Sequence, residues 1–203
     1  VFNPKTKHAT LLKPRNAEYH FLYVCHLSAN GKQPLFYSPK KDGSKVYRGF
    51  VDDGNQIAWT DSFSINLPEN ISGYTFTNSH TMWYLQESTL IETDFASGKI
   101  TPHRDQKNKA LHVGDNGRLL VDHAGNLWFG GKNGAYHFSV KQKRLLHYYT
   151  HKAGDKYAIS GSADPLFADA NNNVWFSVFG LGINYCNLGS VKFSHVLTQS
   201  EAE

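Results

Sequence analysis

Short apolar runs alternate with polar turn segments along most of this chain. In the clearest stretch the runs cover residues 119–121, 127–129, 135–138 and 145–149, and the breaks between them are rich in Asp, Asn and Gly. Glycine tolerates a positive φ, and Asn or Asp side chains bond back to nearby backbone, so such breaks are typical of tight turns. No run is long enough for an ordinary helix. The pattern therefore predicts four short antiparallel strands.

This four-strand unit recurs at a nearly constant period. Residues 119–129 align with residues 166–176, which places Trp128 and Trp175 47 positions apart (175 − 128). Trp83 lies 45 positions before Trp128 (128 − 83), and a more divergent copy centres on Phe36, 47 positions before Trp83 (83 − 36). Repeats of this length with four short strands and an aromatic residue at a fixed place are typical of β-propeller blades.

The repeats define the expected domain organisation, an all-β propeller of about four blades and a partial one. Four-stranded antiparallel blades are predicted at residues 13–60, 61–103, 104–150 and 151–196. Residues 1–12 are predicted to form the outer strands of a preceding blade, and residues 197–203 a tail. Because the chain begins in the middle of a repeat, we expect a fragment of a larger ring. Closure of the chain on itself is the alternative, since most propellers have about four to eight blades.

The aromatic residue at the fixed place is predicted to be structural. A ring at the same position in every blade most simply fills the space between neighbouring sheets, because a large aromatic side chain buries about 150 to 250 Å². The expected blade core therefore consists of Phe36, Trp83, Trp128 and Trp175.

Two aspartates precede the last two tryptophans, and two interpretations fit them. Asp122 and Asp169 lie in turns with neighbouring Asn residues, and oxygen ligands at close spacing suit a calcium ion. No third or fourth carboxylate clusters with them in the sequence. We therefore expect hairpin turns and no metal site.

Composition is that of a folded β domain, with 40% hydrophobic and 14% aromatic residues. Residues 1–50 hold nine Lys or Arg against two acidic residues, and the remainder holds twelve against fifteen, so the first blade carries the basic excess. Basic surface attracts acidic ligands, but three of these lysines surround the turn at Asp42-Gly43, where a solvated loop is the simpler interpretation. Nucleic acid is not an expected partner, and no apolar run is long enough to span a bilayer.

The two cysteines do not indicate a disulfide framework or a paired-cysteine zinc site. Cys25 and Cys186 lie 161 positions apart (186 − 25), in the first and last repeats. Two separate buried thiols are expected, and a bridge between the first and last blades of a ring is the alternative.

Known catalytic motifs are missing from the sequence. It contains no Gly-x-Ser-x-Gly elbow, no His-Glu-x-x-His, no phosphate loop and no dinucleotide fingerprint. The eleven histidines are scattered, and the Asp122-x-x-Gly125-x-x-Trp128 spacing is one residue longer than a sialidase Asp box. We expect no catalytic residue and no cofactor in this segment, although blades converge on an axis where distant residues could form a site.

Residues 121–136, Val-Asp-His-Ala-Gly-Asn-Leu-Trp-Phe-Gly-Gly-Lys-Asn-Gly-Ala-Tyr, resemble the repeat of the two-component regulator propellers, Asp-x-x-Gly-x-Leu-Trp-Ile-Gly-Thr-x-x-Gly-Leu. Residues 159–169 are similar to that family's Leu-Ser-x-Asn stretch, and residues 180–185 to its Gly-Gly-Leu/Ile-Asn-Tyr segment. The resemblance is strong over residues 104–196 and only periodic before them. The family's Thr is replaced by Gly131 and Val178, and the repeat of Trp83 lacks both the Asp and the Gly.

The resemblance implies the periplasmic sensor region of a Bacteroides-type hybrid two-component histidine kinase. In that family seven-bladed rings precede an immunoglobulin-like domain, a membrane helix and cytoplasmic signalling parts, so membrane attachment would come from other parts of the chain. It implies a binding and signalling module that responds to an oligosaccharide or to a homodimer contact and controls polysaccharide-use genes. Two alternatives stay open: a propeller carbohydrate lyase or hydrolase, and a protein-binding scaffold.

Overall fold

The protein is described here by a computed structural model that divides into two compact units, Val1–Pro68 and Glu69–Glu203. Backbone is described for the strands of the first unit. Backbone and side chains are described at residues 68, 71–78, 80–105, 109, 111, 113, 117–190 and 192–196, and the backbone also at 197. The part of the chain that the structure describes contains no helix long and apolar enough to cross a membrane.

The first unit contains a two-stranded and a five-stranded sheet. Strands β1 (Phe2–Asn3) and β2 (His8–Ala9) pair antiparallel. The larger sheet has the order β3-β7-β6-β5-β4, in which β3 runs parallel to β7 and the other pairs are antiparallel. Its strands are β3 (Lys13–Pro14), β4 (Tyr23–Leu27), β5 (Pro34–Ser38), β6 (Ser44–Val51) and β7 (Gln56–Ile65). Strand β7 passes through the expected blade boundary between residues 60 and 61.

The second unit consists of three antiparallel four-stranded sheets, each a simple meander. The first contains β8 (Ile71–Phe76), β9 (Thr81–Gln86), β10 (Thr89–Asp94) and β11 (Lys99–His103). The second contains β12 (Leu119–Val121), β13 (Leu127–Gly131), β14 (Gly134–Ser139) and β15 (Arg144–Thr150). The third contains β16 (Ala163–Ala168), β17 (Asn173–Val178), β18 (Gly182–Asn187) and β19 (Lys192–Leu197).

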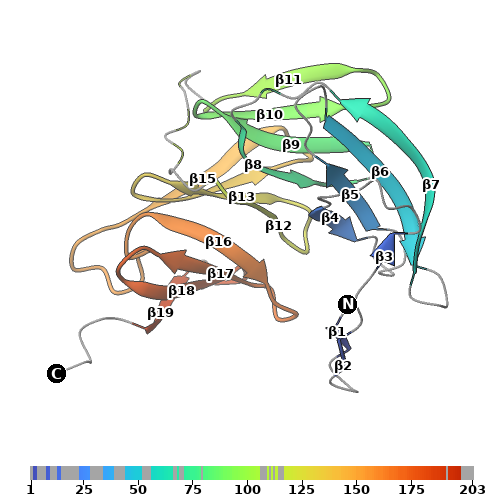
Figure 1. The fold of residues 1–203 in the computed structure, drawn as a ribbon. Helices are drawn as coiled ribbons and strands as arrows, with labels where there is room; N and C mark the ends of the chain where they lie inside the picture. The colour runs from blue at the N-terminus through green and yellow to red at the C-terminus, as the bar shows by residue number, and fades with distance from the viewer. Residues whose placement is uncertain are drawn as a thin grey trace. The chain divides into compact units, whose positions relative to one another are not determined.

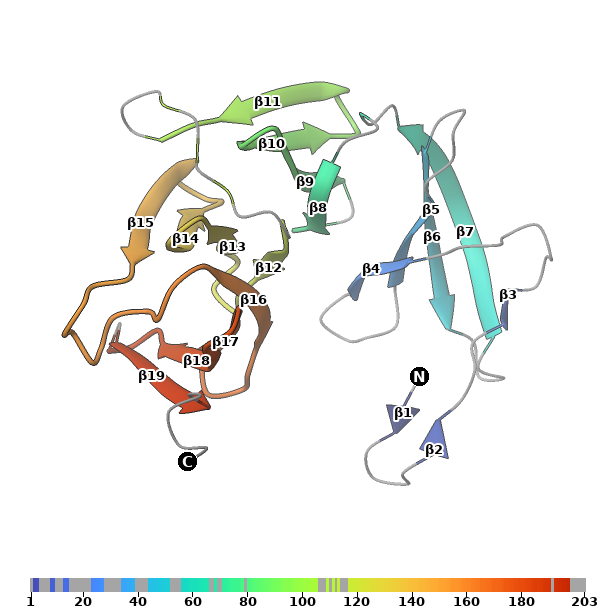
Figure 2. The ribbon, with the colours of Figure 1, turned by 60° about the vertical axis from the view of Figure 1, so that its left-hand side comes forward.

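These three sheets are propeller blades. Strand β12 contacts both β8 and β16, so the first strands of the blades meet on one side, and β11, β15 and β19 lie at the outer edges (Figures 1 and 2). The four strands that the pattern predicts between residues 119 and 149 are confirmed within two residues at each end. The described part of the chain is all-β, and its second unit is built from three four-stranded antiparallel propeller blades, whereas the first unit has a five-stranded sheet with one parallel pair where a four-stranded antiparallel blade was expected.

The turn between the first two strands explains the Asp-x-x-Gly/Asn-x-x-Trp pattern. Asp122 Oδ1 accepts hydrogen bonds from the backbone N–H groups of Ala124 and Asn126, both at 2.9 Å. The residue three positions after the aspartate lies in the left-handed region, where Gly125 has φ 77° and Asn172 has φ 60°. Glycine and asparagine are the residues that tolerate this conformation, so the sequence pattern encodes the hairpin turn.

Two apolar cores join the three blades. One contains Trp83 from the β8–β11 blade and Leu127, Phe129 and Phe138 from the β12–β15 blade. The other contains Trp128 with residues of the β16–β19 blade, among them Val174, Phe176, Cys186 and Phe193. The two faces of the β12–β15 sheet therefore serve different neighbours, as the alternation of side chains along a strand requires.

Candidate functional site

The blade tryptophans share one geometry but differ in burial. Trp83 and Trp128 are fully buried, whereas Trp175 is half-buried. The fourth aromatic of this set, Phe36, lies on β5, and its side chain is outside the described residues. Trp175 differs from its counterparts because the β16–β19 blade buries one face against its neighbour and leaves the Trp175 face half-open.

Each indole is held by an acceptor six residues earlier in the chain. Trp128 Nε1 donates to Asp122 Oδ2 at 2.9 Å, and Trp175 Nε1 donates to Asp169 Oδ2 at 2.8 Å. In the blade without the aspartate, Trp83 Nε1 donates to Thr77 Oγ1 at 3.2 Å. Both carboxylate oxygens of Asp122 and Asp169 are thus used by the turn and the indole, which assigns these aspartates to the hairpin.

These hydrogen bonds also lower the pKa of both carboxyl groups. Burial opposes the ionisation of Asp122, but the His137 ring beside it and hydrogen bonds from Asn126 N–H and Trp128 outweigh burial and lower its pKa. Hydrogen bonds from Trp175 and Asn173 lower the pKa of Asp169 to about 2. Both aspartates are therefore ionised acceptors at neutral pH.

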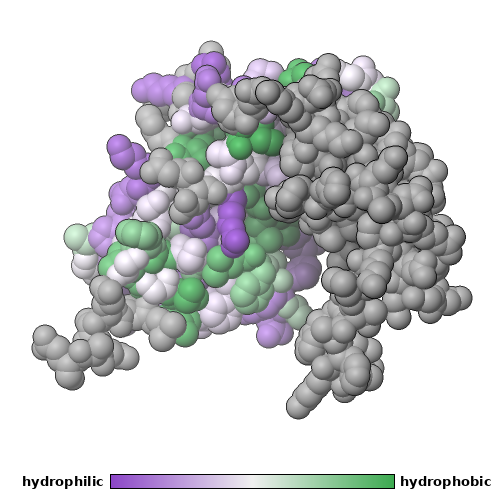
Figure 3. Space-filling model, in the orientation of Figure 1, coloured by the Kyte–Doolittle hydropathy of each residue, from purple (hydrophilic) through white to green (hydrophobic). Residues whose placement is uncertain are grey.

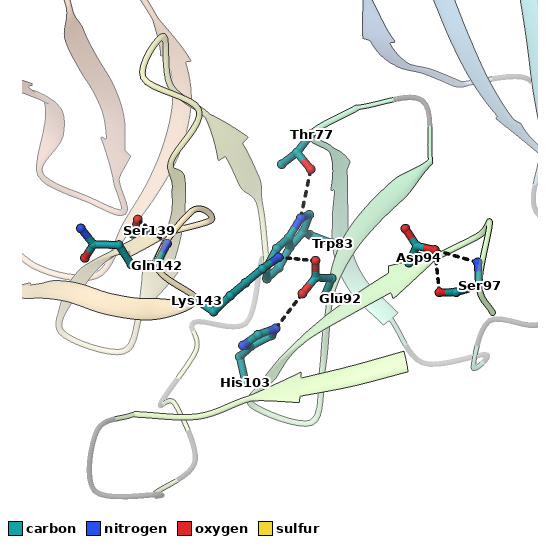
Figure 4. A network of polar contacts seen from close by, with 9 residues as sticks. All are labelled: Thr77, Trp83, Glu92, Asp94, Ser97, His103, Ser139, Gln142 and Lys143. Carbon is teal, nitrogen blue, oxygen red and sulfur yellow. Dashed lines mark hydrogen bonds and ion pairs between the residues drawn. The ribbon is translucent and has the colours of Figure 1, made fainter. Parts of the chain in front are cut away.

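A charged cluster beside Trp83 bridges the β8–β11 and β12–β15 blades (Figure 4). Glu92 on β10 forms ion pairs through Oε2 with His103 Nε2, at 3.1 Å, and through Oε1 with Lys143 Nζ. The Lys143 ammonium also lies 4.7 Å from the centroid of the Trp83 ring. Since Lys143 precedes β15 and Glu92 belongs to the neighbouring blade, this cluster joins two blades by charge.

The cluster is partly solvated and its histidine is packed. The side chain of Lys143 is 45% exposed and that of Glu92 is 16% exposed. The His103 ring lies 5.0 Å from Trp83 and 5.3 Å from Phe138 between ring centroids. Burial lowers the pKa of His103, and this effect outweighs the opposing hydrogen bond and charge of Glu92.

The residue opposite the tryptophan on the third strand changes from blade to blade. Glu92 pairs with Trp83, His137 with Trp128 and Tyr185 with Trp175. The His137 ring stacks on Trp128 at 4.0 Å with 13° between the planes. Its Nε2 has no hydrogen-bond partner and lies 3.6 Å from Asp122 Oδ2. The three blades thus carry a different chemical group at the same place.

A second polar cluster joins the β15–β16 connection to the β16–β19 blade. Ser160 Oγ lies 2.6 Å from His195 Nδ1, and the Ser160 N–H and Oγ each lie 2.9 Å from Asn184 Oδ1. Asn184 is fully buried. A serine hydroxyl beside a histidine resembles an activated nucleophile, but the Ser160 hydroxyl donates to Asn184 Oδ1. Among the described residues no carboxylate contacts His195 to orient its ring.

The cysteine that the structure describes is buried and unreactive. Cys186 is a free thiol in the apolar core between the last two blades. Burial raises its pKa to about 12, so it is a neutral thiol at physiological pH. The side chain of Cys25 lies outside the described residues, so the expected pair of separate thiols stays a prediction for that residue.

Sequence reasoning found the tryptophans and the aspartate turns but missed both polar clusters. Glu92 and Lys143 are 51 residues apart, and Ser160 and His195 are 35 residues apart. Ser160 and Asn184 belong to the two segments that resemble the family, residues 159–169 and 180–185. This resemblance was the sequence signal that could have indicated the second cluster. Among the described residues no group of three or more His, Cys, Asp or Glu side chains could hold a metal ion.

Comparison with known proteins shows the fold and no sequence family. The sequence matches no protein-family model and no curated protein. The structure is similar to an auxiliary nutrient binding protein from Bacteroides thetaiotaomicron, with a TM-score of 0.51 and 9% identity over 86% of this chain and 46% of that one.

Two further solved structures have a similar fold. One is the extracellular domain of BT3049 from B. thetaiotaomicron, described as a hybrid two-component system, with a TM-score of 0.52 and 14% identity over 96% of this chain. The other is the gluconolactonase XC5397 from Xanthomonas campestris, with a TM-score of 0.50 and 17% identity over 86% of this chain. This chain spans 25% and 60% of their respective lengths. The extracellular domain of a Bacteroides two-component system is thus among the proteins that share this fold.

Proposed function

We propose that this chain belongs to the extracytoplasmic ligand-sensing propeller of a membrane-bound two-component regulator. The observation that carries the proposal is the fold shared with the extracellular domain of BT3049, which covers 96% of this chain. The family-like repeat over residues 104–196 supports the same assignment. The proposed ligand is an oligosaccharide, the proposed location is the periplasm, and the proposed output is control of polysaccharide-use genes.

The blades supply a physical basis for sensing. A ligand shifts a protein between two states only by binding one of them more tightly. The contact between the β8–β11 and β12–β15 blades combines an apolar core with the Glu92–Lys143 ion pair, whose lysine is nearly half exposed. Because an exposed ion pair contributes little stability, about 1 kcal/mol or less, a small ligand-dependent displacement can break and remake it at low cost.

The test uses the complete regulator in its own cells with a transcriptional reporter. A panel of oligosaccharides is supplied one at a time, and binding of each to the purified extracytoplasmic region is measured by calorimetry. We expect one saccharide both to bind and to raise or lower reporter output. The matched variants are Lys143→Met, which removes the interblade ion pair, and Lys132→Met, which changes an exposed lysine in the β13–β14 turn. Full reporter response after deletion of the whole propeller would contradict the proposal.

A carbohydrate hydrolase is the second candidate function. It is favoured by the 2.6 Å contact of Ser160 Oγ with His195 Nδ1 and by the fold shared with a gluconolactonase. Its test is turnover of sugar lactones and glycosides by the purified chain. Activity that disappears in Ser160→Ala and persists in Ser162→Ala would establish it, and binding without turnover would favour the sensor.

A further inference from the structure

Tyr157 is an exposed aromatic residue with two lysine side chains over its ring. It lies in the connection between β15 and β16 and is 47% exposed. Lys156 Nζ lies 5.0 Å and Lys192 Nζ lies 4.8 Å from the ring centroid, both within the range of a cation–π interaction. Hydrophobic residues also reach the surface over the β16–β19 sheet (Figure 3), but among the described residues no lysine lies over another exposed aromatic ring. This cluster is therefore a distinct feature of the surface.

Hydrogen bonds fix Tyr157 against the edge of β19. Phe193 N–H donates to the Tyr157 carbonyl oxygen at 3.1 Å, and Phe193 is itself buried in the core of the blade. Tyr157 N–H donates to Asp155 Oδ1 at 3.0 Å, and Ala158 N–H donates to the Asp155 carbonyl oxygen at 3.0 Å. The anchored ring in turn orders the two long lysine side chains. Side chains that are ordered in advance lose less conformational entropy when a ligand binds.

The positive charge of this cluster is not neutralised within the described part of the chain. Lys156 and Lys192 are exposed, and neither forms an ion pair with a described residue. The connection also contains Lys152, against a single carboxylate at Asp155. Because both ammonium groups lie about 5 Å from the same centroid, they are within about 10 Å of each other. That separation is about one Debye length, so an anion placed between the two groups would be attracted by both.

We propose that Lys156, Tyr157 and Lys192 form a subsite for the anionic group of an acidic saccharide, either a uronate carboxylate or a sulfate ester. The ammonium groups donate charge-assisted hydrogen bonds to the anion, and the exposed part of the Tyr157 ring offers an apolar surface to the C–H groups of the sugar. An acidic peptide is disfavoured, because a peptide that added to the edge of β19 would need the Phe193 N–H, which already bonds to Tyr157. The saccharide part of this inference rests on the proposed sensor function, and the acidic group rests on the two lysines.

The inference is tested by binding of saccharides to the purified extracytoplasmic region, measured by calorimetry. Oligogalacturonates supply carboxylates, carrageenan oligosaccharides supply sulfate esters, maltooligosaccharides of the same lengths are the neutral probes, and inorganic sulfate is the free anion. We expect one acidic set to bind at least tenfold more tightly than the neutral set and the free anion. Its affinity should fall several-fold between about 50 and about 300 mM NaCl, because salt screens exposed charges.

Substitutions connect the binding to the three residues. Lys156→Met and Lys192→Met are each expected to weaken binding of the acidic saccharide about tenfold, as the loss of one charge-assisted hydrogen bond predicts. Lys192→Arg keeps the charge and should retain most of the affinity. The matched control is Lys99→Met, which changes an exposed lysine at the start of β11 and should leave binding unchanged. Both lysines of the cluster are exposed, so these variants should keep the wild-type Tm.

Three outcomes would overturn the subsite. These are neutral saccharides that bind as tightly as acidic ones, acidic saccharides whose affinity is the same in both methionine variants, and inorganic sulfate or polyglutamate that binds as tightly as the saccharide. A neutral saccharide that binds and changes reporter output would overturn the subsite and leave the sensor function standing. Lysine-dependent binding of an acidic saccharide would support the subsite even if deletion of the propeller left the reporter response intact, a result that contradicts only the sensor function.

Discussion

Trp128→Ala is the sharpest test of the packing between blades. The indole is fully buried between the β12–β15 and β16–β19 blades. A tryptophan side chain buries about 150 to 250 Å², which at about 25 cal/mol per Å² gives roughly 4 to 6 kcal/mol. Residual burial in the unfolded chain lowers that value by about 10 to 40%. We therefore expect a loss of about 3 to 5 kcal/mol, in the range of other large-to-alanine substitutions.

The matched control is Trp175→Ala in the same 203-residue chain. Trp175 has the same hydrogen bond and the same register but is only half-buried, so its truncation forfeits a smaller transfer free energy. We expect a loss smaller than that of Trp128→Ala, on the order of 2 to 4 kcal/mol. The difference between the two variants isolates the contribution of the neighbouring blade.

The assay is urea unfolding, monitored by hydrogen exchange of the backbone amides of β13 and β14. Exchange reports the second unit separately from the first, which matters because the chain contains two compact units. A loss below about 1 kcal/mol for Trp128→Ala would be typical of a surface position and would refute the buried interface. Equal losses for both tryptophans would refute the proposed difference in packing.

Three further changes have defined outcomes. Asp122→Asn weakens the turn and indole contacts and is expected to lower the free energy of unfolding by about 1 to 3 kcal/mol. Because the pKa of Asp122 is lowered in the folded state, the wild type should lose stability as pH falls below about 4. This loss of stability in acid should be smaller in the variant. Gly134→Ala would place its Cβ 1.7 Å from the Tyr149 carbonyl oxygen, so thermal denaturation should show a large drop in Tm. A double-mutant cycle of Glu92→Gln and Lys143→Met should give a coupling of about 0.5 kcal/mol that disappears in high salt, because the lysine is nearly half exposed.

The strands and turns of the second unit could be predicted because their causes are local. The alternation of apolar and polar residues determines which face of a strand is buried. The turn at Asp122 needs only an aspartate, a residue that tolerates a positive φ and the following indole donor, all within seven positions of the sequence (122 to 128). These contacts lie inside one hairpin, and a single sequence therefore reveals them.

The polar clusters could not be predicted because they depend on the register between blades. Glu92 contacts Lys143 only because the β8–β11 and β12–β15 sheets pack in one particular relative orientation. Neither residue belongs to a recognisable sequence motif. The burial of Trp175 depends in the same way on what lies beyond its sheet. The repeat predicts equal burial for Trp128 and Trp175, but their burial differs because the sheets around them differ.

Each blade combines a constant structural position with a variable one. The tryptophan and its acceptor are held in every described blade, whereas the residue opposite the tryptophan is Glu92, His137 or Tyr185. A carboxylate there binds a lysine across the blade contact, while histidine and tyrosine stack on the indole. Charge pairs respond to salt and to nearby charged groups, whereas stacked rings do so much less. We therefore expect any ligand-dependent movement to concentrate at the contact between the β8–β11 and β12–β15 blades, with the β12–β15 and β16–β19 blades moving as one body.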